Sequence, residues 1–177
     1  MKIGILSDTH GWLHPELRSF FKGVDHIIHA GDIGSMDVLR QLSAIAPTTA
    51  VRGNIDGEEF YDLEQIEYLR LCGKRIFVVH NAGEPVRPVY DLNSRILSRP
   101  ADILISGHYH AFWLHGLKNR RLLWISPGAA GNSGHHADRL ALRMEILPED
   151  QQTGDITSDY KIEKINLGKR GAPAEKN

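Results

Sequence analysis

The sequence contains one cysteine, no long hydrophobic run and almost no net charge, and each of these scarcities excludes a class of protein. Cys72 alone cannot form an internal disulfide, which excludes a small secreted domain held together by disulfides and favours the cytoplasm. The apolar run at residues 3–6 is too short for a signal peptide or a membrane span, so we expect a soluble protein with no membrane partner. Because Lys and Arg total 21 against 22 Asp and Glu, no basic excess supports the binding of long nucleic acids.

The length and the composition fit a single globular domain. The chain has 177 residues, of which 41% are hydrophobic and 24% charged, and this allows one well-formed core. We place the domain at residues 1–167 and expect the polar tail, residues 168–177, to fray. The sequence leaves open whether copies of the chain form a homo-oligomer.

Short apolar runs alternate with helical patterns in the first part of the chain. The runs are rich in Val and Ile and predict buried strands at residues 2–7, 26–29, 48–52, 75–80 and 101–106. Helices are predicted near residues 15–21, 36–45 and 89–98. Two hairpins, 66–71 with 75–80 and 111–117 with 121–126, precede further strands at 139–147 and 160–167. These elements predict an α/β (α+β) sandwich of two mixed sheets with helices outside.

Side chains that bind metals follow five successive predicted strands, at the point where each strand ends. Open α/β sheets place their sites at the carboxyl ends of strands, so we expect these side chains to converge. A mixture of carboxylate, carboxamide and imidazole donors suits Mn²⁺, Fe²⁺ or Zn²⁺ better than Ca²⁺ or Mg²⁺. The donors exceed the needs of one tetrahedral ion, and two ions that share a bridging carboxylate would use them all. The predicted metal ligands are Asp8, His10, Asp32, Asn54, His80, His108 and His110.

The order of these residues resembles that of a known family. The elements Asp8-x-His10, Gly31-Asp32, Gly53-Asn54, His80 and Gly107-His108-x-His110 are similar to the motif series of the calcineurin-like metallophosphoesterases. The resemblance covers about residues 1–147, and residues 51–56 are similar to those of the small YfcE-like phosphodiesterases. It implies a single metallophosphoesterase domain folded as a four-layer αββα sandwich, in which helices flank the two sheets. It also implies that two ions share Asp32: the first is held by Asp8, His10, Asp32 and His110, and the second by Asp32, Asn54, His80 and His108.

The resemblance and the ligand set predict a metal-dependent phosphoesterase, foremost a phosphodiesterase, that hydrolyses small phosphate esters, nucleotide-like ones included. The nucleophile would be a hydroxide bridging two divalent metal ions, with Mn²⁺ expected first and Fe²⁺, Zn²⁺, Ni²⁺ or Co²⁺ as alternatives. Asn54 is predicted to contact the phosphate as well as an ion. Arg52 is a second candidate contact, although a surface ion pair explains it equally well.

Position 55 departs from the family pattern. Larger members carry a His here that is thought to protonate the leaving group, small relatives often carry Cys, and this chain has Ile55. A general acid is worth about 10²–10⁴-fold in rate, so its absence favours weakly basic leaving groups or another proton donor. The candidate donors are Asp56, Tyr109, His135 and His136, which the sequence does not rank.

Two other functions remain open. The same fold could serve as a protein-interaction scaffold with weak or absent catalysis, as in the eukaryotic retromer relatives that resemble these enzymes. A phosphomonoesterase is the second alternative. Intact ligand residues argue against the scaffold, because a scaffold has no need to keep four imidazoles in one site.

Four further histidines are predicted to lie outside the site. His26 and His29 belong to the strand that leads to Asp32, where they can point away from the ions. His14 and His115 are predicted to lie at the surface. A histidine without partners of its own kind is more often structural than a ligand.

Overall fold

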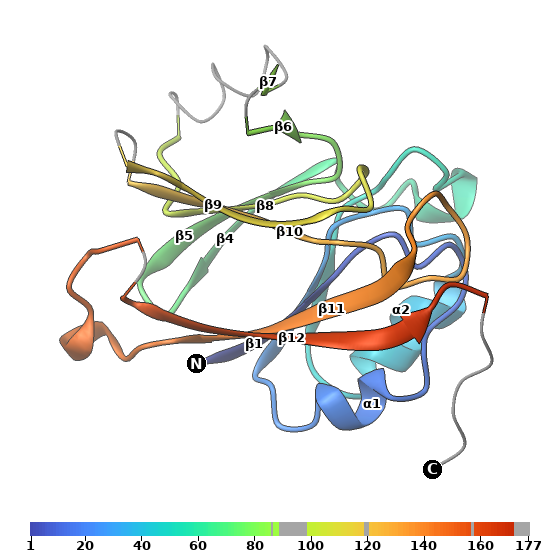
Figure 1. Cartoon of the computed structure of the whole chain (residues 1–177), viewed down its shortest axis with the longest axis horizontal. Helices are drawn as coiled ribbons and strands as arrows, with labels where there is room; N and C mark the ends of the chain where they lie inside the picture. The colour runs from blue at the N-terminus through green and yellow to red at the C-terminus, as the bar shows by residue number, and fades with distance from the viewer. Residues whose placement is uncertain (86, 89–98, 119–120, 157, 172–177) are drawn as a thin grey trace.

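Two five-stranded β-sheets pack face to face in the computed structural model (Figure 1). The structure describes residues 1–171 except 86, 89–98, 119–120 and 157. The first sheet has the order β12 (Tyr160–Lys169), β11 (Asp138–Ile146), β1 (Lys2–Leu6), β2 (His26–His29) and β3 (Thr48–Ala50). The second has the order β4 (Ile66–Leu71), β5 (Lys74–Val79), β8 (Ile103–Ile105), β10 (Leu122–Pro127) and β9 (Phe112–Leu117). The short strands β6 (Gly83–Glu84) and β7 (Arg87–Pro88) pair with each other.

Both sheets are mixed, with parallel strands at the centre. In the first sheet β1, β2 and β3 run parallel, and β11 joins β1 in the antiparallel sense. In the second sheet β5, β8 and β10 run parallel, with β4 and β9 antiparallel at the two edges. Parallel neighbours point their carboxyl ends the same way, so the loops that follow β1, β2 and β3 share one edge. The predicted α/β sandwich of two mixed sheets is confirmed.

The strands β1 and β2 of the first sheet bury side chains on both faces, which explains their continuous apolar runs. Ile5 and Ile28 point toward the second sheet and belong to the core between the sheets. Leu6 and Ile27, their neighbours in the chain, point the other way and pack against the helices. Every one of these side chains is fully buried.

Helices cover only the outer face of the first sheet in the described part of the chain (Figure 1). The helix α2 (Met36–Ser43) begins where the Ser35 side chain accepts a hydrogen bond from the Asp37 N–H, 3.2 Å away, as an N-cap does. The helix α1 (Leu17–Phe20) is a single turn, shorter than the predicted 15–21. Two 3₁₀ turns, η1 (Glu58–Phe60) and η3 (Glu149–Gln151), complete the elements. The predicted helix at 89–98, which would cover the second sheet, lies outside the described residues, and none of the described helices is long and apolar enough to cross a membrane.

The predicted hairpin of β4 and β5 is confirmed, and Cys72 lies in its turn. Leu71 pairs with Lys74, so Cys72 and Gly73 form a two-residue loop. Their φ angles of 47° and 74° are both positive, as a type I′ turn requires. Gly73 takes this conformation without strain, because it has no Cβ.

The expectation that the chain frays from residue 168 is wrong for residues 168–171. Strand β12 continues to Lys169, which pairs with Asp138 of β11. Beyond the strand, the Arg170 N–H donates to the Ala137 carbonyl oxygen and the Gly171 N–H donates to Asn132 Oδ1. Residues 168 and 169 are held by backbone pairing with β11, which a sequence of polar side chains does not indicate. Residues 172–177 lie outside the described residues.

A buried ion pair joins the two sheets at the end of β5 remote from His80. The Lys74 Nζ, at the start of β5, lies 2.7 Å from Asp159 Oδ2, just before β12. Thr153 and Gly154 donate three more hydrogen bonds to the same carboxylate, which is fully buried. Burial by itself would raise the pKa of Asp159, but Lys74 and these donors outweigh it and lower the pKa from 3.8 to about 2.

Replacing Asp159 with Asn should therefore destabilise the fold in a pH-dependent way. A carboxyl with so low a pKa in the folded state contributes about 2 kcal/mol at neutral pH. We expect Asp159→Asn to lose about this much free energy of unfolding at pH 7. The difference from wild type should shrink as the pH falls from 3.8 toward about 2, because the contribution is lost as the carboxylate gains its proton. Urea unfolding at a series of pH values measures this difference in the free energy of unfolding, and the exposed Asp150→Asn is the control. A difference that does not change with pH would contradict the prediction.

Candidate metal centre

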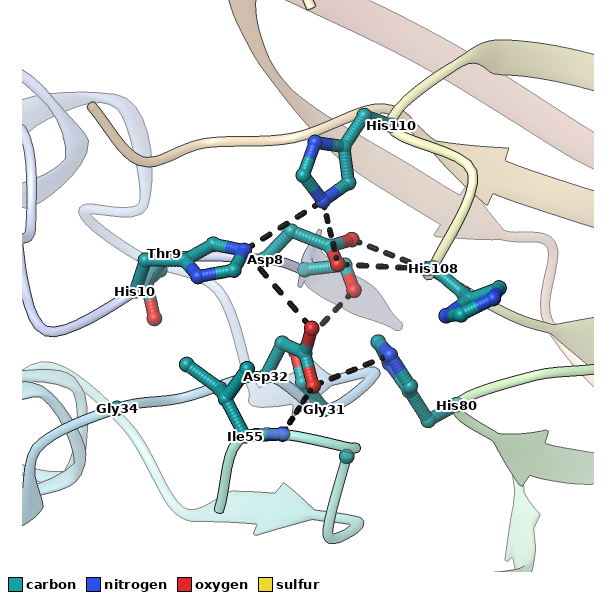
Figure 2. Close-up of polar contacts among 12 residues, drawn as sticks. Asp8, Thr9, His10, Gly31, Asp32, Gly34, Ile55, His80, His108 and His110 are labelled. Carbon is teal, nitrogen blue, oxygen red and sulfur yellow. Dashed lines mark hydrogen bonds and ion pairs between the residues drawn. The ribbon is translucent and has the colours of Figure 1, made fainter. Parts of the chain in front are cut away.

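Six of the seven predicted ligands, all except Asn54, are seen to converge at one edge of the sandwich, where the carboxyl ends of the central strands of both sheets meet (Figure 2). Each predicted ligand follows a strand by one to five residues, so its side chain is carried on a short loop that a rigid strand positions. The first sheet supplies Asp8 and His10 after β1, Asp32 after β2 and Asn54 after β3; the second supplies His80 after β5, and His108 and His110 after β8.

Four of these residues form a compact group. One ligand atom from each of Asp8, His10, Asp32 and His110 lies within 4.8 Å of the other three. The His110 Nε2 is 3.2 Å from Asp8 Oδ1 and 3.4 Å from the His10 Nε2, which is 3.8 Å from Asp32 Oδ2. These are the four residues that the resemblance implies for the first ion. Two carboxylate and two imidazole donors facing one point are a donor set for a divalent transition metal.

His80 faces the other oxygen of Asp32. Its Nδ1 donates to the Ala30 carbonyl oxygen at 2.7 Å, so in the neutral ring the Nε2 carries a lone pair. That Nε2 is 3.2 Å from Asp32 Oδ1, a contact that becomes a hydrogen bond only when the ring is doubly protonated. Among the described residues this buried Nε2 has no hydrogen-bond partner. A cation between His80 and Asp32 would give the orphaned nitrogen the partner that it lacks.

Two further predicted ligands lie beside this second group. The His108 ring stands edge-on to the His80 ring, with centroids 5.2 Å apart. Asn54 is an exposed residue of the loop after β3, between Gly53 and Ile55. The Ile55 N–H donates to Asp32 Oδ1 at 3.1 Å, which brings this loop against the Asp32 carboxylate. Figure 2 shows Asp32 with His10 on one side and His80 on the other.

The backbone at the ligands is strained. Of the seven described non-glycine residues with positive φ, five are predicted ligands, and the other two, Cys72 and Arg121, lie in turns. The angles are 54° at Asp8, 47° at His10, 55° at Asp32, 74° at His108 and 55° at His110. A side chain held at positive φ costs about 1–2 kcal/mol, and such strain collects at functional sites. The observed outliers therefore support the prediction that these loops carry the site.

Gly53 and Asp56 hold the loop after β3 against the loop after β2. A Cβ on Gly53 would lie 2.2 Å from both the backbone nitrogen and Oδ1 of Asp32, so only glycine allows this approach. The buried Asp56 carboxylate accepts three backbone hydrogen bonds, from Ile33 at 3.1 Å and from Gly34 and Gly53 at 2.8 Å. Its oxygens are committed to these donors, a positioning task that its place in the sequence did not reveal.

His29 links the loops beneath the ligands. It is fully buried; its Nδ1 accepts from the Gly31 N–H, and its Nε2 donates to Thr9 Oγ1 at 2.9 Å. Burial, the main cause, lowers the pKa of His29 to about 4, so the ring is neutral at physiological pH. The prediction that His29 does not face the ions is consistent with these contacts. Its support of Thr9, between Asp8 and His10, was not foreseen.

The prediction of surface positions is right for His115 and wrong for His14. His115 is exposed on β9. His14 is only 2% exposed, and its ring packs edge-on against Trp12 with centroids 5.2 Å apart. The contact with Trp12, two residues away, accounts for the burial of His14. The sequence alone did not indicate this contact.

The charges of the site favour an ionised Asp32. Burial acts to raise its pKa, but the hydrogen bond and charge of His80, the Ile55 N–H and the charge of His10 lower it to about 2. For His80, burial acts to lower the pKa, and the Asp32 and Asp8 carboxylates reverse this and raise it. Without a cation, the site therefore attracts a proton to His80. A divalent cation must displace that proton, so metal binding should weaken at low pH.

The remaining candidates occupy different positions. The Arg52 guanidinium lies over the Tyr61 ring, 5.0 Å from its centroid, and stacks on it. Tyr109 is 43% exposed, between the two histidines of the last ligand loop. His135 is exposed, whereas His136 is buried against His110.

Comparison with known proteins agrees with this arrangement. A family model described as "Calcineurin-like phosphoesterase superfamily domain" matches residues 1–147. A probable metallophosphoesterase of Methanocaldococcus jannaschii is 34% identical in an alignment of 137 positions that covers 73% of this chain and 68% of that protein. A phosphodiesterase of the same organism is 30% identical in an alignment of 146 positions that covers 72% of this chain and 83% of that protein. The crystal structure of wild-type Vps29 complexed with zinc, from Entamoeba histolytica, has a TM-score of 0.69 at 16% identity, covering 94% of this chain and 99% of that one.

Removal of the shared carboxylate should abolish tight metal binding. We expect metal-free wild-type protein to bind Mn²⁺ in isothermal titration calorimetry, and Asp32→Ala to bind at least about 100-fold more weakly. The loss should exceed the 10–100-fold that supporting residues contribute, because Asp32 faces both groups of imidazoles. The control is Asp37→Ala, which removes an exposed carboxylate on α2. Equal affinity of the wild type and Asp32→Ala would contradict the assignment.

Proposed function

The chain belongs to the calcineurin-like phosphoesterase superfamily, and we propose that it is a phosphodiesterase that hydrolyses small phosphate esters at a site for two divalent cations. The observation that carries this proposal is the position of Asp32. One of its oxygens faces His10 of the compact group and the other faces His80. A carboxylate so placed can serve two ions at once, and two ions are what in-line displacement at phosphorus uses.

Each side chain has a role in this proposal. Asp8, His10 and His110 complete one ion's set, and His80, His108 and Asn54 complete the other, with Asp32 common to both. When bound, the pair of cations would lower the pKa of a shared water and neutralise charge on the oxygens of the phosphoryl group. The Asn54 amide, exposed beside Asp32, could also donate to a phosphoryl oxygen.

The donor set also bears on the identity of the ions. Imidazoles mixed with carboxylates and one amide favour Mn²⁺, Fe²⁺ or Zn²⁺, with Ni²⁺ and Co²⁺ also suited. We propose Mn²⁺ as the first ion to test. The cytoplasmic location expected from the single cysteine stays a prediction.

The proton for the leaving group has no dedicated donor in this proposal. Ile55 is 49% exposed, and only its backbone N–H reaches Asp32. Asp56 accepts three hydrogen bonds and is better suited to holding the loops than to donating a proton. We therefore propose that the preferred esters have weakly basic leaving groups, whose departure needs little proton transfer.

A protein-interaction role is the second candidate. The reason to consider it is the likeness to Vps29 (vacuolar protein sorting 29) described above. At 16% identity this likeness concerns the fold alone. The ligand loops argue for chemistry, because a scaffold has no use for five strained ligand backbones. The two candidates differ in what they require: hydrolysis needs the ions and Asp8, whereas docking of a partner on a remote surface needs neither.

Activity should depend on added metal and favour diesters. We expect metal-free protein to be inactive, and Mn²⁺ to restore hydrolysis of bis-p-nitrophenyl phosphate with a higher kcat/KM than that of p-nitrophenyl phosphate. Asp8→Ala should lower kcat/KM by about 10²–10³-fold or more, as loss of one charge-stabilising group does. The exposed Asp37→Ala is the control. A faster monoester would replace the diesterase by a monoesterase, and inactivity with every metal tested would favour the interaction role.

Restoring a histidine at position 55 should widen the range of esters. Since the Ile55 side chain is half-exposed and its hydrogen bond to Asp32 comes from the backbone, Ile55→His should keep the fold and the site. We expect roughly a 10–100-fold rise in kcat for diesters with alkyl alcohol leaving groups, and little change for p-nitrophenyl esters. Ile55→Gln, which has no group that titrates, is the matched control. An equal gain for both kinds of ester would contradict the idea that a general acid is missing.

A further inference from the structure

His136 contacts the ring nitrogen of His110 that faces away from the other ligands. The two rings stand edge-on with centroids 5.2 Å apart, and their Nδ1 atoms are separated by 3.3 Å. His110 presents its other nitrogen, Nε2, to Asp8 and His10 (Figure 2). His136 is 8% exposed, whereas its neighbour His135 is exposed.

The hydrogen bonds around these rings determine where their protons are. The His136 Nε2 lies 3.0 Å from the carbonyl oxygen of Gly131, which can only accept, so this nitrogen carries hydrogen. A neutral imidazole has a single N–H, and the His136 Nδ1 is therefore an acceptor. Its partner, the His110 Nδ1, must then be the donor. In the neutral ring the remaining nitrogen of His110, Nε2, keeps its lone pair for a cation, and it lies 3.2 Å from Asp8 Oδ1.

We propose that His136 is a positioning residue of the metal centre, which holds His110 in the Nδ1–H tautomer with its Nε2 lone pair directed at the first ion. The inference rests on the proposed metal site and assigns His136 a task other than proton donation. Partners of this kind orient a ligating histidine and make it more basic, and their loss typically costs 10–100-fold in metal affinity.

The loop that carries His136 is built around the His110 ring. A Cβ on Gly134 would lie 2.1 Å from His110 Cε1, so glycine alone lets the backbone approach the ring this closely. The Gly131 N–H donates to the carbonyl oxygen of Asp8 at 3.1 Å, so the acceptor for His136 is itself tied to a ligand.

The end of β12 holds this loop in place. The Arg170 Nε donates to the carbonyl oxygen of His136 at 3.0 Å, and the Arg170 N–H donates to the adjacent Ala137. Arg170 lies beyond residues 1–147, the part of the chain that matches the family model. The support of His110 thus comes partly from a residue outside the range that matches the family model.

Calorimetric titration of the metal-free full chain with Mn²⁺ tests the proposal. We expect His136→Leu to lower the affinity about 10–100-fold. His136→Gln should retain most of it, because its amide can accept from His110 and donate to Gly131. His135→Leu, the same change one residue earlier, should bind like wild type. Unchanged affinity in His136→Leu would overturn the proposal, as would an equal loss in His135→Leu.

The tautomer of His110 provides a second readout that needs neither metal nor substrate. Long-range ¹H–¹⁵N NMR of metal-free wild type should find hydrogen on the His110 Nδ1. In His136→Leu the Nδ1 should lose this hydrogen, and the ring should carry hydrogen only on Nε2, which can donate to Asp8 Oδ1. A wild-type His110 protonated only on Nε2 would overturn the proposal even if His136→Leu does not fold. Failure of wild type to bind any divalent cation would instead refute the metal site, so the two failures are distinguishable.

Discussion

The Asp32 carboxylate lies between imidazoles from both sheets, and the neighbouring loops are arranged to keep it there. Its own backbone has positive φ, Gly53 leaves room for the next loop to approach, and the Ile55 N–H donates to one oxygen. Asp56 then ties the two loops together. Each of these features costs strain or buried charge. Together they keep the Asp32 carboxylate ionised and fixed between the two groups of predicted ligands.

This arrangement implies that the fold and the site compete. Backbone strain at five ligands and two buried carboxylates oppose folding, so the rest of the sandwich must supply the stability. The buried residues of the core between the sheets, and both partners of the ion pair of Lys74 with Asp159, have none of the positive φ angles of the ligands. A bound cation would offset part of this cost, because it neutralises the charges that the site holds together.

The sequence predicted most of the fold and the position of the site. Parallel strands bring their carboxyl ends together, so placing Asp8, Asp32 and His80 after apolar runs was enough to predict a shared edge. The resemblance is confirmed by the family match over residues 1–147. The roles of supporting residues escaped prediction, since they depend on contacts such as that of His136 with Gly131 or of Asp56 with Gly34, which no periodicity marks. The extent of the last strand was also misjudged, because its pairing with β11 is made by backbone groups that polar side chains conceal.

The hydrogen bond from Arg170 to the carbonyl oxygen of His136 bears on how such a site can change over time. Substituting a ligand destroys a centre, so ligand positions leave little freedom for gradual adjustment. Arg170 reaches the site only through the carbonyl oxygen of His136. A substitution at Arg170 would therefore change how firmly His110 is held without altering any side chain that faces the ions.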